Sequence, residues 1–201
     1  VIRGGHRVYA DAAYVADAPR FNQAFVSPRT RNSIVPDLKT SKTFAADLNY
    51  AYSNSGYDVR VTGYYTTIKD QSKVMSFYDD AQNSFTNFAM SGMDERHVGV
   101  ELGFKVPLPV PNLSLQGVLS YGQYVYTSNP VMYQTYDNSA AIVEETYGVT
   151  IPYWKSHPTA EGKTVKHYVS GTPQLATSLG LAWNKNYWLV DADVDWFDKA
   201  Y

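Results

Sequence analysis

Apolar and polar side chains alternate along much of this chain with a period of two. Val98, Val100 and Leu102, for example, are separated by Gly99 and Glu101. Because successive side chains of a β-strand point to opposite faces, the alternation predicts strands with one apolar and one polar face. Such strands are predicted over residues 6–15, 42–53, 57–68, 94–106, 113–127, 173–184 and 187–198. No helical period of useful length is present, so the chain is expected to be all-β.

The connections between these strands differ sharply in length. Long and short connections alternate in the order 16–40, 53–56, 69–93, 107–112, 129–171 and 184–186. The long ones exceed the roughly 4–6 residues that are typical of compact domains. Short periplasmic turns and long extracellular loops are typical of outer-membrane barrels, whereas a soluble β-sandwich has no reason to sort its loops in this way. The pattern therefore predicts an antiparallel transmembrane β-barrel segment with about seven up-and-down strands.

Composition narrows the class of protein. Charged residues make up 18% of the chain and aromatic residues 15%, whereas an ordinary soluble domain carries about 25% charged residues. The net charge of −2 gives no reason to expect a nucleic-acid partner. The chain has no Cys, which excludes disulfides and thiolate metal sites. No run approaches the ~18 apolar residues of a transmembrane helix, so a membrane crossing would have to use strands.

The polar face of the predicted strands supplies one set of candidate site residues. Five charged positions are expected to face the lumen of the barrel: Asp47, Arg60, Glu101, Asp191 and Asp193. The functional interpretation is contact with a plug or a ligand, and the plain interpretation is ordinary barrel alternation. The charge run DERH at 94–97 is expected to be a solvated rim at the outward end of a strand rather than a metal site, because its arginine would repel a cation.

The longest connection, 129–171, supplies a second set of candidates. It carries five aromatic residues that are predicted to bind a ligand: Tyr133, Tyr136, Tyr147, Tyr153 and Trp154. Exposed aromatic side chains are costly unless they pack or bind, and loops on rigid scaffolds often carry function. Stacking on a sugar ring or clamping a ligand is the functional interpretation. Folding of the loop back on itself or onto a plug is the alternative.

The sequence contains none of the common catalytic motifs. GxSxG, HExxH, the P-loop and the dinucleotide fingerprint are all missing. Adjacent carboxylates such as Asp79 and Asp80 would point apart in an extended chain, so they do not form a general acid–base pair. We therefore expect no enzyme activity, no cofactor and no metal site.

Six stretches along the chain stand out together: FVSPRTRN at 25–32, VPDLK at 35–39, RVTGYYT at 60–66, SGMDERHVGVELG at 91–103, GTPQ at 171–174 and DWFDKAY at 195–201. They resemble the C-terminal part of the β-barrel of TonB-dependent outer-membrane receptors of the Bacteroidetes type. The resemblance implies a barrel of about 22 strands whose lumen holds an N-terminal plug. It also implies a location in the bacterial outer membrane. Such receptors import a scarce nutrient, for example a siderophore, cobalamin, an oligosaccharide or a peptide, with energy passed on by TonB.

The chain departs from this family pattern in two respects. It contains neither a plug nor a TonB-contacting segment, and it has far fewer strands than a whole barrel. An open sheet cannot sit in lipid with unpaired edges. Residues 1–201 are therefore expected to be a partial barrel domain of a larger receptor. Its expected partners are outer-membrane lipid, the rest of its own barrel and plug, the nutrient ligand, and TonB through a segment outside this chain. The alternatives are a passive porin and a soluble, aromatic-rich β-sandwich that binds carbohydrate.

Overall fold

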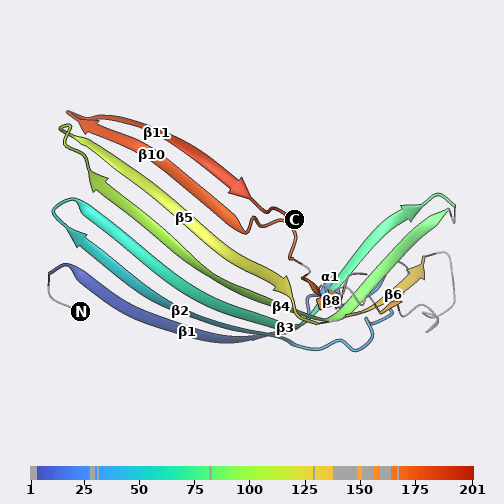
Figure 1. Ribbon diagram of the computed structural model, residues 1–201. Coiled ribbons are helices and arrows are strands. Elements are labelled where there is room, and N and C mark those ends of the chain that lie inside the picture. Colours follow the sequence, from blue (N-terminus) through green and yellow to red (C-terminus); the bar gives the residue numbers. More distant parts are fainter. Residues whose placement is uncertain are drawn as a thin grey trace.

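The long strands of the chain form one curved antiparallel layer. The computed structural model describes residues 4–27, 30, 32–81, 83–128, 130–137, 149–150, 156–158, 164–166 and 168–201. Hydrogen bonds join neighbouring strands in the order β1 (His6–Asp17), β2 (Ser41–Asn54), β3 (Tyr57–Asp79), β4 (Ser84–Pro107), β5 (Leu113–Tyr126), β10 (Leu175–Lys185) and β11 (Trp188–Asp198) (Figure 1). Every predicted strand is present, so the predicted all-β, up-and-down fold is confirmed.

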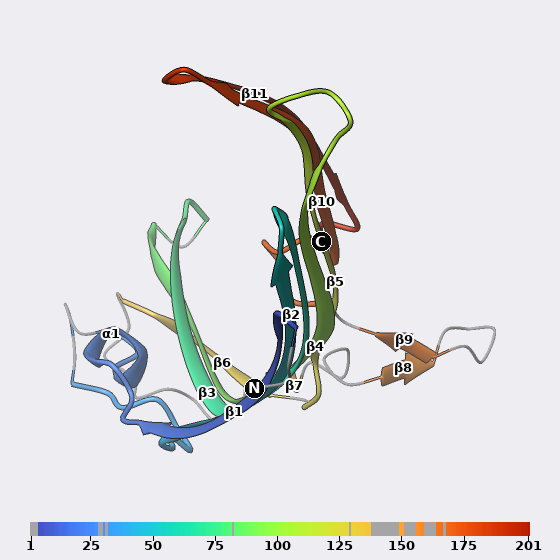
Figure 2. The same cartoon turned by 90° about the vertical axis from the view of Figure 1, so that its left-hand side faces the viewer.

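The sheet is open, because β1 and β11 lie at its two edges and do not pair with each other. Figure 2 shows a single curved layer rather than two sheets packed face to face. This arrangement excludes the β-sandwich alternative for the described strands. It is the arrangement expected of a segment of barrel wall.

Short elements occupy the long connections. A single helical turn, α1 (Phe21–Ala24), follows β1. The connection between β5 and β10 contains β6 (Val131–Tyr136), β7 (Val149–Thr150), β8 (Ser156–Pro158) and β9 (Thr164–Lys166). β6 pairs with β4 and with β7, whereas β8 and β9 form a separate two-stranded sheet. In the part of the chain that the structure describes, no helix has the length and apolar character needed to span a membrane.

The strand register sorts the side chains into two faces. Directly paired residues of neighbouring antiparallel strands point to the same face. One such row joins Val8, Tyr50, Val61, Leu102 and Leu119 across β1 to β5. We call this side the apolar face. The neighbouring row, which lies on the opposite side, joins Tyr9, Asn49, Thr62, Glu101 and Ser120, and we call that side the polar face.

Two tight turns fix this register at one end of the sheet. Ser55 and Gly56 have φ values of 50° and 86°, and Asn186 and Tyr187 have φ values of 49° and 70°. Positive φ at both central residues is the requirement of a two-residue type I′ hairpin, whose twist matches that of the flanking strands. The predicted short connections are thus confirmed at these two positions.

The connection between β3 and β4, at the opposite end of the sheet, differs from the prediction. A long loop was expected over 69–93, but β3 continues to Asp79 and β4 begins at Ser84. The register shifts between Ile68 and Lys73, where Asp70 has a φ of 57°. Beyond this irregularity, residues 73–79 of β3, residues 84–91 of β4 and the strand β6 form a three-stranded extension, visible in Figure 1 where the ribbons bend away from the sheet. We call this extension the arm and the rest of the long sheet the wall.

The arm carries the small apolar core of the described chain. Val26, Val35 and Ala89 are each no more than 1% exposed and pack together, with Leu38 and Val74 against them. Val26 and Val35 belong to the β1–β2 connection, which a bridge between Phe25 and Ile34 folds into a loop on the arm. The wall has no comparable cluster among the described residues.

The charge run at 94–97 is also placed differently from the prediction. It lies in the middle of β4 rather than at the end of a strand, because β4 continues outward for ten residues before it. Glu95 is 8% exposed and its carboxylate Oε2 lies 3.0 Å from Nε2 of His97 on the polar face. The prediction that this charge run is a solvated rim is therefore wrong for Glu95.

Candidate functional site

The five predicted lumenal residues all lie on the polar face. Asp47 pairs with Tyr64, Arg60 with Gly103, Glu101 with Ser120, Asp191 with Ala182 and Asp193 with Gly180. Their side chains come from β2, β3, β4 and β11, so they are spread over the wall. The register brings them to one face and does not bring them into one cluster.

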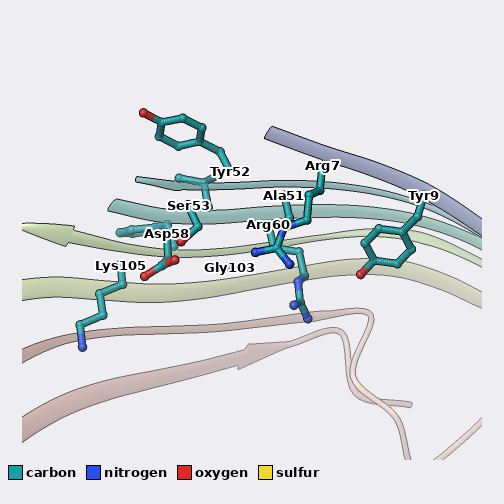
Figure 3. A pocket seen from close by; sticks show the side chains of 11 residues that line it. Arg7, Tyr9, Ala51, Tyr52, Ser53, Asp58, Arg60, Gly103 and Lys105 are labelled. Carbon is teal, nitrogen blue, oxygen red and sulfur yellow. The ribbon is translucent and has the colours of Figure 1, made fainter. Parts of the chain in front are cut away.

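A hollow of about 680 Å³ lies on the polar face near the tight-turn end (Figure 3). It is lined by Arg7, Tyr9, Asp58, Arg60 and Lys105, among others. The structure describes no carboxylate within salt-bridge distance of the three cations. The hollow therefore has an excess of positive charge, which favours an anionic group. Arg7 was not among the predicted sites, although the alternation of its strand places it on this face.

Three carboxylates form a separate group on the polar face. Asp191, Asp193 and Asp195 follow one another at alternate positions of β11. Gln116 donates a hydrogen bond from Nε2 to Oδ1 of Asp193 over 3.2 Å. A Cβ atom at Gly180 would collide with the Asp193 carboxylate, which explains the glycine at that position. The sign of the charge thus changes from one part of the polar face to another.

Hydrogen bonds cross the polar face between these charged groups. Thr62 donates from Oγ1 to Oδ1 of Asn49 over 2.7 Å, and Asn49 donates from Nδ2 to Asp47. The hydroxyls of Tyr64 and Tyr124 lie 2.5 Å apart. Tyr64 reaches Tyr124 because Gly99 and Gly122 leave space beneath its ring, where a Cβ would clash with it. Side chains on this face therefore support one another across three strands.

A second hollow, of about 430 Å³, lies where the β1–β2 connection meets β3. Asp17, Arg20, Lys39 and Asp70 contribute charges of both signs to its lining. Lys39 Nζ lies 3.7 Å from Oδ1 of Asp70. This hollow is at the end of the wall from which the arm extends, so it is a candidate entry site for a polar ligand.

The predicted aromatic ligand-binding residues are only partly described. Tyr133 and Tyr136 lie on β6 and are half-buried in the arm, where they pair with Ala89 and Thr86. They are three residues apart on a strand and so point to opposite faces, which means that they do not form one stacking platform. Tyr147, Tyr153 and Trp154 lie outside the described residues.

A buried polar knot holds the arm to the β1–β2 connection. Ser27 donates from Oγ and Asn87 donates from Nδ2 to Oδ1 of Asp137, each over 2.6 Å. Ser76 donates from Oγ to Oδ1 of Asn87 over 2.6 Å. Asn87 is fully buried. Sequence reasoning missed this knot, because its members are up to 110 residues apart and no local spacing marks them.

Metal-ligating side chains do not gather in the described part of the chain. No group of three or more His, Asp or Glu residues is placed to hold an ion there.

Comparison with known proteins gives one family and one solved structure. A family model described as TonB dependent receptor-like, beta-barrel matches residues 2–201. The crystal structure of the toluene transporter TodX of P. putida is similar at 12% sequence identity with a TM-score of 0.34, covering 94% of this chain and 49% of that chain. The chain thus spans about half the length of that protein. No curated protein matches.

Proposed function

Because the chain belongs to the TonB-dependent receptor-like β-barrel family, whose model matches residues 2–201, we propose that it forms part of the wall of a receptor for energy-coupled nutrient uptake. Barrels of this family lie in the outer membrane of Gram-negative bacteria, and this chain is an outer-membrane protein with a general role in transport. Its apolar face then meets lipid and its polar face meets the lumen. The observation that carries the proposal is the family match over the whole sheet together with this separation of faces.

The open sheet supports the proposal that this chain is part of a larger barrel. Each unpaired N–H or C=O group on a strand edge in hydrocarbon costs several kcal/mol. In the proposal, further strands pair with β1 and β11, and residues 1–201 are a partial barrel domain. A plug that lies in the lumen and carries the TonB-contacting segment is assigned to the remainder of the receptor.

The charges on the polar face support the proposal that a plug fills the lumen. Arg7 and Arg60 have no carboxylate within salt-bridge distance in the described chain, and Asp11 and Asp47 are directly opposite each other. Like charges opposite each other on a sheet are destabilising. A plug with complementary charges would neutralise the unpaired cations and reduce the repulsion between the two facing carboxylates. Asp47, Arg60, Glu101, Asp191 and Asp193 are therefore proposed as contacts of the plug or of the passing ligand.

The nutrient is proposed to enter from the side of the arm. The mixed-charge hollow with Arg20, Lys39 and Asp70 suits a ligand with several polar groups. A siderophore, cobalamin, an oligosaccharide and a peptide all have this character. Tyr133, Tyr136, Tyr147, Tyr153 and Trp154 stay proposed ligand contacts of the connection after β5. No chemical step is assigned to the wall.

Conductance and uptake measured on the complete protein test the proposal. The expected result in a planar bilayer is no steady current, because a plug closes the lumen, together with uptake in cells that stops when TonB is removed. A passive porin gives a steady current and uptake that is independent of TonB. That second result would contradict the proposal and establish the porin alternative.

A further inference from the structure

An acidic and a basic side chain line the hollow between the β1–β2 connection and β3 without pairing with each other. Asp17 is the last residue of β1, and Arg20 lies three positions further along the chain, directly before α1. Within the described residues, no cation lies within salt-bridge distance of Asp17 and no carboxylate lies within that distance of Arg20. The hollow therefore presents one free negative group and one free positive group.

The two other charges of the hollow compensate each other. Lys39 Nζ lies 3.7 Å from Oδ1 of Asp70 on the side of β3. Asp70 also donates its backbone N–H to Oδ1 of Asp94 over 2.9 Å, so its position on the wall is fixed. Because this ion pair is closed within the chain, Asp17 and Arg20 are the charged groups that remain available to a ligand.

Asp17 and Arg20 are held on different hydrogen-bonded segments of the backbone. Asp17 belongs to β1, which is paired with β2 along its whole length. Arg20 precedes a turn that is closed by a hydrogen bond of 2.8 Å from the backbone N–H of Gln23 to the Arg20 carbonyl oxygen. That turn is tied in its place by a second backbone hydrogen bond, of 2.9 Å, from Val35 to Ala24. The separation of the two charges is thus set by the backbone on either side of the hollow.

The rest of the lining is mostly polar. Ser41 and Thr43 of β2 and Gln71 and Ser72 of β3 contribute hydroxyl and amide groups. The buried Nε2 of Gln71 has no hydrogen-bond partner in the part of the chain that the structure describes. Buried amide groups normally have one, so this donor is unused in the chain alone. The volume of about 430 Å³ lies within the range of small-molecule sites.

We propose that this hollow binds the α-amino acid group of a small zwitterionic ligand that has a polar side chain. The ligand ammonium lies against the Asp17 carboxylate, and the ligand carboxylate lies against the Arg20 guanidinium, whose planar fork matches a carboxylate. The polar groups of β2 and β3 then meet the side chain of the ligand. The inference rests on the proposed function, since it names the chemical class of the ligand that enters at this hollow.

The test measures binding of L-glutamine and two derivatives to the complete receptor, purified in detergent, by isothermal titration calorimetry. N-acetyl-L-glutamine lacks the ammonium, and the α-amide of L-glutamine lacks the carboxylate. The unchanged receptor is expected to bind each derivative at least about tenfold more weakly than L-glutamine, because one charge-assisted contact is lost. Glycyl-L-glutamine, in which the two charges lie on different residues, is expected to bind more weakly as well.

Two variants assign the contacts one at a time. Arg20→Gln is expected to bind L-glutamine and its α-amide equally while still discriminating against the acetylated form, and Asp17→Asn is expected to show the reverse. Both side chains are exposed, so neither substitution removes a buried contact. The matched controls are Lys42→Gln, on the opposite face of β2, and Asp37→Asn, in the same connection but outside the lining. Both controls are expected to bind as the unchanged receptor does.

The inference is overturned if L-glutamine does not bind, if the derivatives bind as well as L-glutamine, if either variant keeps both preferences, or if a control loses as much affinity. Tighter binding of glycyl-L-glutamine would overturn it in favour of a peptide. Binding in detergent needs neither TonB nor transport, so a negative result here would contradict the ligand class alone. Uptake that is independent of TonB would contradict the proposed function alone.

Discussion

The wall and the arm are built from the same two strands, β3 and β4, yet they are stabilised in different ways. Along the wall, large apolar residues such as Leu48, Val100 and Val194 are 43–74% exposed on one face. In the arm, Ala89 and Met90 are adjacent on β4 and both are almost fully buried. The wall therefore depends on lipid to cover its apolar face, whereas the arm folds around its own core and a buried polar knot.

The largest expected effect is the loss of the arm's polar knot. Asn87→Ala removes the donor to Asp137 and the acceptor of the Ser76 hydroxyl in a fully buried position, and is expected to cost about 2–4 kcal/mol of local stability. Hydrogen exchange on the complete protein is expected to speed up over residues 84–91 and 32–38, and not over β10. Asn184→Ala, at an exposed position of the wall, is the control. Equal exchange in both variants would contradict a structural role for the knot.

The second test compares a core valine with a lipid-facing one. Val26→Ala leaves a cavity in the cluster beneath the arm and is expected to cost about 1–3 kcal/mol. Val190→Ala, at a position that is 55% exposed on the apolar face, is expected to cost less, because lipid fills the space. Unfolding in urea with the protein in lipid vesicles measures both. A larger loss at Val190 would reverse the distinction between the two regions.

Substitution of a glycine is expected to have different effects on the two faces of the wall. Gly180→Ala is expected to displace the Asp193 carboxylate from the polar face and to lower stability by about 1–2 kcal/mol, since overpacking is costly. Gly63→Ala faces open space on the apolar side and is expected to be close to neutral or stabilising. The midpoint of urea unfolding is measured for both variants. Equal midpoints would mean that the polar face is not closely packed at Gly180.

The smallest expected effect comes from one hydroxyl group. Tyr64→Phe removes the hydrogen bond to Tyr124 across the polar face and is expected to cost about 0.5–1.5 kcal/mol. Tyr65→Phe, at the next position on the apolar face, is the matched control and is expected to cost less, since its side chain is 42% exposed. A cost at Tyr65 as large as that at Tyr64 would show that the tyrosine pair does not stabilise the wall.

The sequence predicted the wall well because the wall has two different environments, and alternation encodes them directly. It did not predict the arm, because Thr86 and Asn87 are both buried there and interrupt the alternation with polar side chains. Asn87 donates a hydrogen bond to Asp137, which also accepts one from Ser27, and both of these partners are far from Asn87 in the chain. The residues predicted to face a lumen could be assigned to the polar face from their odd or even positions in each strand alone. The hollow around Arg7, Arg60 and Lys105 could not be predicted in this way. It depends on how neighbouring strands align, and the sequence of a single strand does not contain that register.

The central claim is that the two faces of the wall meet different media, and labelling of β4 tests it most directly. The chain has no Cys, so single substitutions from Thr86→Cys to Phe104→Cys each give one site for a spin label. Accessibility to oxygen, which dissolves in lipid, and to a water-soluble nickel chelate is then measured in vesicles. Oxygen accessibility is expected to alternate with a period of two from Val98 to Phe104, with maxima at Val98, Val100 and Leu102, and to lose that period between Asn87 and Met90. Equal accessibility of neighbouring positions along 98–104, or maxima at Gly99 and Glu101, would contradict the account.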